Sequence, residues 1–81
     1  MILKIYWNGK SKNIIGERIK ALRVKNNLTQ EGLAINLQLE GHQFSDLTIL
    51  RIENGKRFVP DYEVKILANY FKVSYAYLLD D

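Results

Sequence analysis

Short apolar stripes at helical spacing run through the chain, and residues that favour helix ends stand between them. The clearest stripe follows Thr29, a good N-cap, and it consists of Leu33, Ala34 and Leu37. The start and stop signals lie close together along the chain, so the expected helices are short. The repeated pattern predicts an all-α fold, a bundle of five short amphipathic helices with tight connections.

Capping residues define where these five helices start and stop. The expected starts are Asn13, Thr29, Ser45, Pro60-Asp61 and Ser74. Two stops are expected at Asn26-Asn27 and Asn54-Gly55, because Asn and Gly tolerate the left-handed conformation that ends helices. Besides the stripe after Thr29, the residues expected to face inward are Ile15, Ile19 and Leu22, with Val24 as a further candidate, then Ile49, Ile52, Val64, Leu67, Ala68 and Phe71. The last short helix contains Leu78 and Leu79.

The connection between the second and third helices is unusually long. We expect the second helix to run on to Leu39, a loop broken at Gly41 to follow, and Phe44 to anchor that loop in the core. Gly32 lies inside the second helix, where it costs roughly 1 kcal/mol relative to Ala. A glycine kept at that cost suggests a close packing approach there.

The first residues form a separate arm. Leu3, Ile5 and Trp7 fall on one side at a period of two, and Asn8-Gly9 is a turn signal, so a short strand or arm is expected. We therefore divide the chain into an arm, 1–13, and a helical domain, 14–81. Two roles for the arm stay open: packing on its own domain, or pairing with a second copy across a two-fold axis.

Composition excludes several classes of protein. The chain has 81 residues and no cysteine, which rules out disulfides, zinc fingers, iron–sulfur clusters and thiol catalysis. His42 is the only histidine and has no companion ligands, so no metal or other cofactor is expected. No nucleophile–base pair can be placed, so neither an enzyme nor a small-molecule substrate is expected. The longest apolar run is five residues against the about 20 of a membrane span, and no signal peptide is recognisable, so a cytoplasmic module is expected.

The mild net charge of +3 hides an uneven distribution. Residues 1–28 carry seven basic groups and one acid, for +6, whereas 29–50 carry three acids and no base, for −3. Residues 51–57 return to +2, and 58–81 carry −2. The two basic zones either converge in space as a phosphate-facing surface or form an ordinary solvated face.

Two motifs connect this pattern with a known family. Thr29-Gln30-Glu31 with Leu33-Ala34, and the run Arg51-Ile52-Glu53-Asn54-Gly55-Lys56, resemble the XRE family of phage repressor and Cro proteins, here in a long-turn variant. The pattern Ile15-Gly16-Glu17-Arg18-Ile19 and the ending Val73-Ser74 with Leu78-Leu79 are also similar to that family. The resemblance implies a lambda-repressor-like helix-turn-helix domain and a sequence-specific, non-enzymatic regulator. It also implies double-stranded DNA as the partner, with a homodimer on a palindromic operator.

The resemblance also implies roles for individual residues. Asp46, Leu47 and Arg51 occupy the positions at which family members contact base edges. A further pair, Arg23 and Glu53, matches a semi-buried salt bridge between the first and third helices. The residues implied at backbone phosphates are Gln30, Asn54, Lys56 and Arg57.

The expected recognition helix, about 45–54, has an unusual outer face. Its stripe consists of Asp46, Leu47, Leu50, Arg51 and Asn54, opposite Ile49 and Ile52. Arg suits guanine, Leu the thymine methyl and Asp the cytosine amino group. An acid and two leucines would equally suit a protein partner, so the alternative is an antirepressor-like or antitoxin-like interaction module of the same fold.

Overall fold

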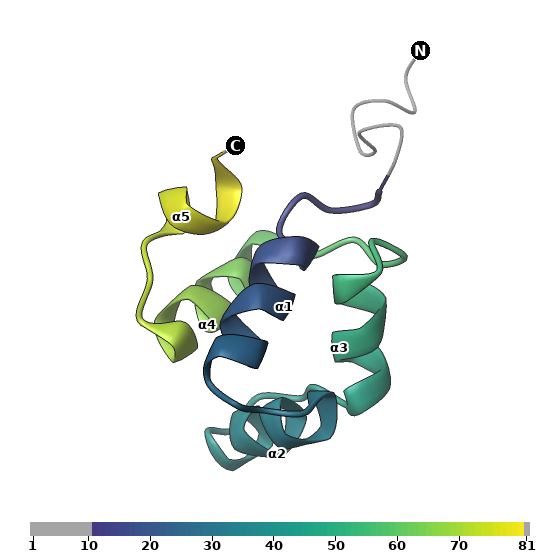
Figure 1. Cartoon of the computed structure of the whole chain (residues 1–81), viewed down its shortest axis with the longest axis vertical. Helices are drawn as coiled ribbons and strands as arrows, with labels where there is room; N and C mark the ends of the chain where they lie inside the picture. The colour runs from purple at the N-terminus through teal and green to yellow at the C-terminus, as the bar shows by residue number, and fades with distance from the viewer. Residues whose placement is uncertain (1–10, 81) are drawn as a thin grey trace.

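The computed structural model describes residues 11–80, which form five α-helices and no strand. The helices are α1 (Gly16–Lys25), α2 (Gln30–Leu39), α3 (Asp46–Glu53), α4 (Asp61–Phe71) and α5 (Tyr75–Leu79). In Figure 1, α1 lies at the centre, α3 to its right, α4 behind it and α2 across the lower end. The five expected helices are thus confirmed. The predicted strand or arm at 1–7 lies outside the described residues.

Hydroxyl side chains start three of the helices as expected. In each, the side-chain oxygen accepts a hydrogen bond from the backbone N–H three residues further on: Thr29 from Gly32 (2.9 Å), Ser45 from Thr48 (3.1 Å) and Ser74 from Tyr77 (3.0 Å). Asn13 differs, because the first helix begins only at Gly16. Its Oδ1 nevertheless accepts a hydrogen bond of 2.9 Å from the Gly16 N–H. Asn13 thus pairs the first N–H of the helix, although it lies two residues before the N-cap, Ile15.

The first four helices all end in the same way. After each, one residue adopts a positive φ: Asn27 (58°), Gly41 (92°), Gly55 (73°) and Lys72 (57°). The next residue's N–H then bonds back to a carbonyl in the last helical turn: Leu28 to Arg23 (3.0 Å), His42 to Leu37 (3.0 Å), Lys56 to Arg51 (2.9 Å) and Val73 to Ala68 (3.0 Å). These are Schellman motifs, which satisfy carbonyls that a helix end leaves unpaired. The sequence indicated the first three stops but not Lys72.

The core lies where these helices meet, and its buried apolar residues are Ile15, Ile19, Leu22, Leu33, Ala34, Leu37, Phe44, Ile49, Ile52, Val64, Leu67, Ala68 and Leu78. The expected place of Val24 in this set is wrong, since 56% of its surface is exposed. At about 100° per residue, Val24 lies half a turn around the helix from Ile15. In the last helix Leu78 is buried and Leu79 is exposed, and Phe71 is half-buried at the edge of the core.

A glycine sets the distance between α1 and α3. A Cβ atom added at Gly16 would lie 2.3 Å from the carbonyl oxygen of Ile52, so no side chain fits between the two backbones. The close approach was expected at Gly32 instead. There an added Cβ would be nearest, at 3.2 Å, to Oγ1 of its own helix cap, Thr29, so no second helix approaches Gly32 closely.

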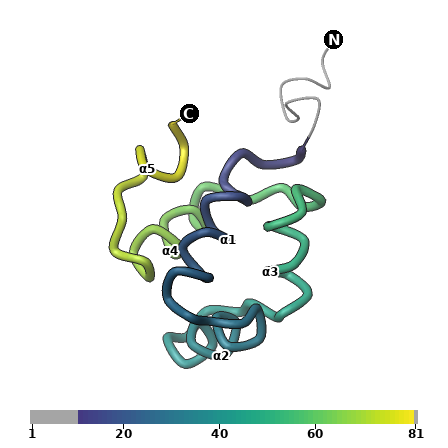
Figure 2. Tube along the Cα trace, in the orientation of Figure 1, coloured from purple at the N-terminus to yellow at the C-terminus, as the bar shows by residue number. Residues whose placement is uncertain are grey.

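The long connection between α2 and α3 has the expected form. The second helix does run to Leu39, and Phe44 is buried. Gln38 donates from Nε2 to the Phe44 carbonyl at 2.6 Å, which ties the end of α2 to the start of α3. The tube in Figure 2 shows a further neighbour relation: the chain entering α1 runs beside the connection from α3 to α4. Among residues 11–80, no helix has both the length and the apolar character needed to cross a membrane.

Candidate nucleic-acid interface

The outer face of α3 is exposed as the stripe pattern predicted. Ile49 and Ile52 are fully buried, and the residues opposite them are open to solvent: Asp46, Leu47, Leu50, Arg51 and Asn54. Two of these are large apolar side chains, with Leu47 46% and Leu50 37% exposed. The stripe is therefore available to a partner along the full length of the helix.

The acid at the start of this stripe also has a local structural role. Asp46 Oδ1 accepts a hydrogen bond of 2.8 Å from the Leu47 N–H, in the first turn of α3. A negative charge is favourable there, because the N-terminus of a helix carries a partial positive charge. Part of the carboxylate is thus already engaged in the free protein.

Arg23 and Glu53 form the ion pair that the resemblance implied. Arg23 donates to both carboxylate oxygens, from Nε at 2.7 Å and from Nη2 at 3.0 Å, and a third bond goes to the Leu28 carbonyl at 2.8 Å. The hydrogen bond to Glu53 raises the pKa of Arg23 above its ordinary value, although burial acts in the opposite direction. The pair ties the end of α1 to the end of α3 and leaves little charge for a ligand.

Gln30 is joined to the same cluster. Its Nε2 donates to Glu53 Oε1 at 3.1 Å, and the side chain is half-buried at the start of α2. The structure therefore places Gln30 beside the ion pair, with its amide oriented by Glu53. A helix N-terminus of this kind offers backbone N–H groups to an anion.

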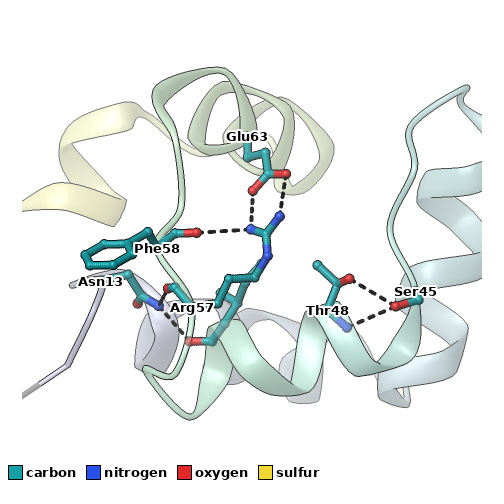
Figure 3. A network of polar contacts seen from close by, with 7 residues as sticks. Asn13, Ser45, Thr48, Arg57, Phe58 and Glu63 are labelled. Atoms are coloured by element: carbon teal, nitrogen blue, oxygen red, sulfur yellow. Dashed lines mark hydrogen bonds and ion pairs between the residues drawn. The ribbon is translucent and has the colours of Figure 1, made fainter.

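The loop that follows α3 carries three residues predicted to contact phosphates, and these differ in their surroundings. Asn54 and Lys56 are exposed. Arg57 instead forms a two-pronged ion pair with Glu63 of α4, at 2.5 and 3.0 Å, and also donates to the Phe58 carbonyl at 3.1 Å (Figure 3). The hydrogen bond to Glu63 raises the pKa of Arg57. Glu63 is only 7% exposed, so the Arg57 guanidinium is the partner of a buried carboxylate, while 32% of the Arg57 side chain remains exposed.

Sequence reasoning missed two residues that shape this loop. One is Glu63, although a signal was present: it lies four residues before the buried Leu67, on the apolar face of α4. The other is Asn13, whose Nδ2 donates to the Ile52 carbonyl at 3.1 Å and the Arg57 carbonyl at 2.9 Å. The sequence pattern indicated only its capping role.

A compact helical fold in which an exposed, capped helix follows a second helix across a turn defines the class of helix-turn-helix DNA-binding domains. This chain belongs to the XRE-type helix-turn-helix family, because the family model described as a helix-turn-helix domain matches residues 16–81. The resemblance inferred from the motifs is thereby confirmed. No curated protein and no solved structure gives a match to the chain.

Proposed function

We propose that this protein is a sequence-specific transcriptional regulator of the repressor/Cro type, which binds duplex DNA with α3 in the major groove. The observation that carries the proposal is the exposed stripe on α3 within a helix-turn-helix domain of the XRE type. The major groove admits an α-helix, and each base pair presents a distinct pattern of donors and acceptors there. The protein acts by binding alone, in the cytoplasm, without catalysis or a cofactor.

Each exposed residue of α3 suits a particular base edge. Arg51 pairs with O6 and N7 of guanine, and Leu47 packs on a thymine methyl group, with Leu50 beside it. Asp46 accepts from the cytosine amino group with the oxygen that the Leu47 N–H does not occupy. These three kinds of contact would recognise a mixed sequence rather than a run of one base pair.

Phosphate contacts come from both sides of α3. Asn54 and Lys56 contribute from the loop after the helix, and Gln30 contributes together with the N-terminus of α2. Arg57 supports these phosphate contacts indirectly, by holding the loop, because its guanidinium is bound to Glu63. The protein binds as a homodimer to a palindromic operator, with half-sites one helical turn, about 34–36 Å, apart.

A second candidate function follows from the apolar part of the same face. Leu47 and Leu50 are neighbours on α3, both are exposed, and Asp46 beside them would repel phosphates. An antirepressor-like or antitoxin-like module would use this face to bind a protein instead of a duplex.

Selection from a pool of randomised duplexes distinguishes the two functions. A regulator enriches one motif with two-fold symmetry, and its affinity falls with rising salt at a log–log slope of about −0.9 per phosphate contact. A protein-interaction module enriches no motif. That result at low salt, with the protein shown to be folded, would refute the proposed function.

A further inference from the structure

The segment that leads into α1 is fastened to the loop that follows α3. Asn13 makes three hydrogen bonds with its side-chain amide: Oδ1 accepts from Gly16 at 2.9 Å, and Nδ2 donates to Ile52 at 3.1 Å and to Arg57 at 2.9 Å. Figure 3 shows the amide nitrogen turned toward the Arg57 backbone. One side chain thus links the start of α1, the end of α3 and the loop.

Backbone contacts reinforce this link one residue earlier. The Lys12 N–H donates to the Gly55 carbonyl at 2.8 Å. This bond brings the two backbones into direct contact, and Gly55, with a φ of 73°, leaves no room for a Cβ atom beside the Ser11 side chain. Lys12 is therefore held next to Gly55, the residue before Lys56.

The loop is fixed from its other side by α4. Arg57 directs its guanidinium to the buried carboxylate of Glu63, while its carbonyl accepts from Asn13 (Figure 3). Both ends of the 54–57 loop are thus held, and Asn54 and Lys56 remain exposed between them. Lys12 is also exposed, with its ammonium group 5.6 Å from the centre of the Phe58 ring.

We propose that Lys12 and Lys56 together form one phosphate-binding edge. Asn13 is the positioning residue that holds the two segments of this edge together, the segment before α1 and the loop after α3. The inference rests on the proposed function. It adds a contacting residue, Lys12, and an indirect one, Asn13, whose amide sets the loop backbone without touching DNA. Two exposed cations on adjacent chain segments suit contacts with backbone phosphates.

The first test measures how the affinity of the full-length protein for its selected duplex depends on salt. Lys12→Ala and Lys56→Ala each remove one contact, so each lowers the log–log slope by about 0.9. The fall in affinity between 50 and 200 mM salt then becomes roughly threefold smaller for each variant. Lys65→Ala is the charge-matched control, since Lys65 is exposed on α4 beside Tyr62 and Tyr75, and its slope should equal that of the wild type.

The second test isolates the donor half of the Asn13 amide. Asn13→Ser keeps an oxygen acceptor suited to the cap of α1 but removes the Nδ2 amide group that donates to the Ile52 and Arg57 carbonyls. In the free protein, amide hydrogen exchange at Gly55 and Lys56 should accelerate, while that at Ile19 inside α1 should not change. On DNA the slope should fall, and Lys56→Ala should cost less in the Asn13→Ser background than alone, because the two residues act through one loop.

Three outcomes would overturn the inference. An unchanged slope for Lys12→Ala removes Lys12 from the edge. Additive effects of Asn13→Ser and Lys56→Ala, or unchanged exchange at Gly55, remove Asn13 as the positioning residue. If Asn13→Ser does not fold, the slopes of Lys12→Ala and Lys56→Ala still decide whether the edge exists. A wild-type protein that binds no duplex refutes the proposed function itself, a result distinct from a bound complex with unchanged slopes.

Discussion

Two arginines close together in the sequence occupy different chemical environments in the fold. Arg51 is exposed on α3 and forms no ion pair with any residue between 11 and 80. Arg57 is paired with the buried Glu63, and Arg23 is paired in the same manner with Glu53. Among residues 11–80, the Arg51 guanidinium thus has no carboxylate partner, whereas Arg23 joins α1 to α3 and Arg57 joins the loop after α3 to α4.

Arg51→Ala should therefore affect recognition without unfolding the protein. We expect binding to the selected operator to weaken by roughly 1–3 kcal/mol and selectivity at one base pair to relax. Lys56→Ala should weaken binding to all duplexes by a similar factor. Titration of each variant with operator and unrelated duplex checks this. Equal losses on both duplexes for Arg51→Ala would show that Arg51 contacts a phosphate.

Arg57→Ala should affect stability more than recognition. The substitution leaves the Glu63 carboxylate buried without its partner, which costs on the order of 1–3 kcal/mol for a buried polar group. Urea unfolding of the variant beside Lys56→Ala, its exposed neighbour, measures the difference. If both variants unfold at the same urea concentration, the Glu63 pair does not stabilise the fold.

The sequence located the exposed stripe and the Arg23–Glu53 pair, but it did not reveal the pairing of Arg57 with Glu63. The stripe follows from helical periodicity, which depends only on local spacing. Whether an arginine in a loop faces solvent or a carboxylate depends on where α4 lies across the core. That placement is a tertiary property, as is the reach of Asn13 to Arg57, 44 positions away.

At the scale of the helices, Gly16 determines how closely α1 and α3 pack. Gly16→Ala should destabilise the fold by about 1–3 kcal/mol, because the new methyl group meets the Ile52 carbonyl oxygen and the helices must separate. Gly32→Ala is the matched control, since its methyl group closely meets only the side-chain oxygen of its own cap, and a shift of that oxygen offsets part of the gain of up to about 1 kcal/mol in helix propensity. Thermal unfolding followed by circular dichroism compares the two. An equal loss for both would contradict the close α1–α3 contact.

At Lys72, unlike at Gly16, a substitution should raise the stability of the protein. It ends α4 at a φ of 57°, a conformation that costs a residue with a Cβ atom about 1–2 kcal/mol. Lys72→Gly should therefore stabilise the protein, by less than that amount because glycine also frees the unfolded chain. Lys65→Gly, inside the same helix, should destabilise it by about 1 kcal/mol. A higher urea midpoint for the first variant and a lower one for the second are the expected results.

The residue type at each positive φ explains which helix ends could be predicted from the sequence. Asn27, Gly41 and Gly55 are residue types that favour a positive φ, so their stops were visible before the fold was known. Lysine has no such preference, so the residue type gave no sign that α4 ends there. The burial of Phe44 was predictable for a related reason, since a large aromatic residue inside a polar loop needs a core to pack against.

For the molecule as a whole, the fold brings together parts of the two basic zones. Lys12 belongs to the first zone and Lys56 to the second, and the bond from the Lys12 N–H to the Gly55 carbonyl places their backbones side by side. The acidic stretch between the zones includes the start of α3. Lys12 and Lys56 thus lie near the C-terminal end of α3, and Asp46 lies at its N-terminal end. The charge of the proposed DNA-contacting face therefore changes sign along the helix.

The proposed dimer can be tested on the whole chain. If the apolar segment 1–10 supplies a contact across the two-fold axis, the mass of the full-length protein should rise with concentration, whereas a chain that starts at Ser11 should remain monomeric. Sedimentation equilibrium of both proteins measures this. The same association in both would exclude the segment as the dimer contact.

The way each helix ends has a consequence for the rate of association. The hydroxyl caps, the Schellman turns and the Gln38–Phe44 bond hold α3 in place through contacts within the chain, so the surface that meets a duplex exists before the encounter. The five helices between residues 11 and 80 are already formed in the free chain. Encounter should therefore proceed at a rate set by diffusion, charge and orientation, and variants of the α3 stripe should differ mainly in how long the complex lives.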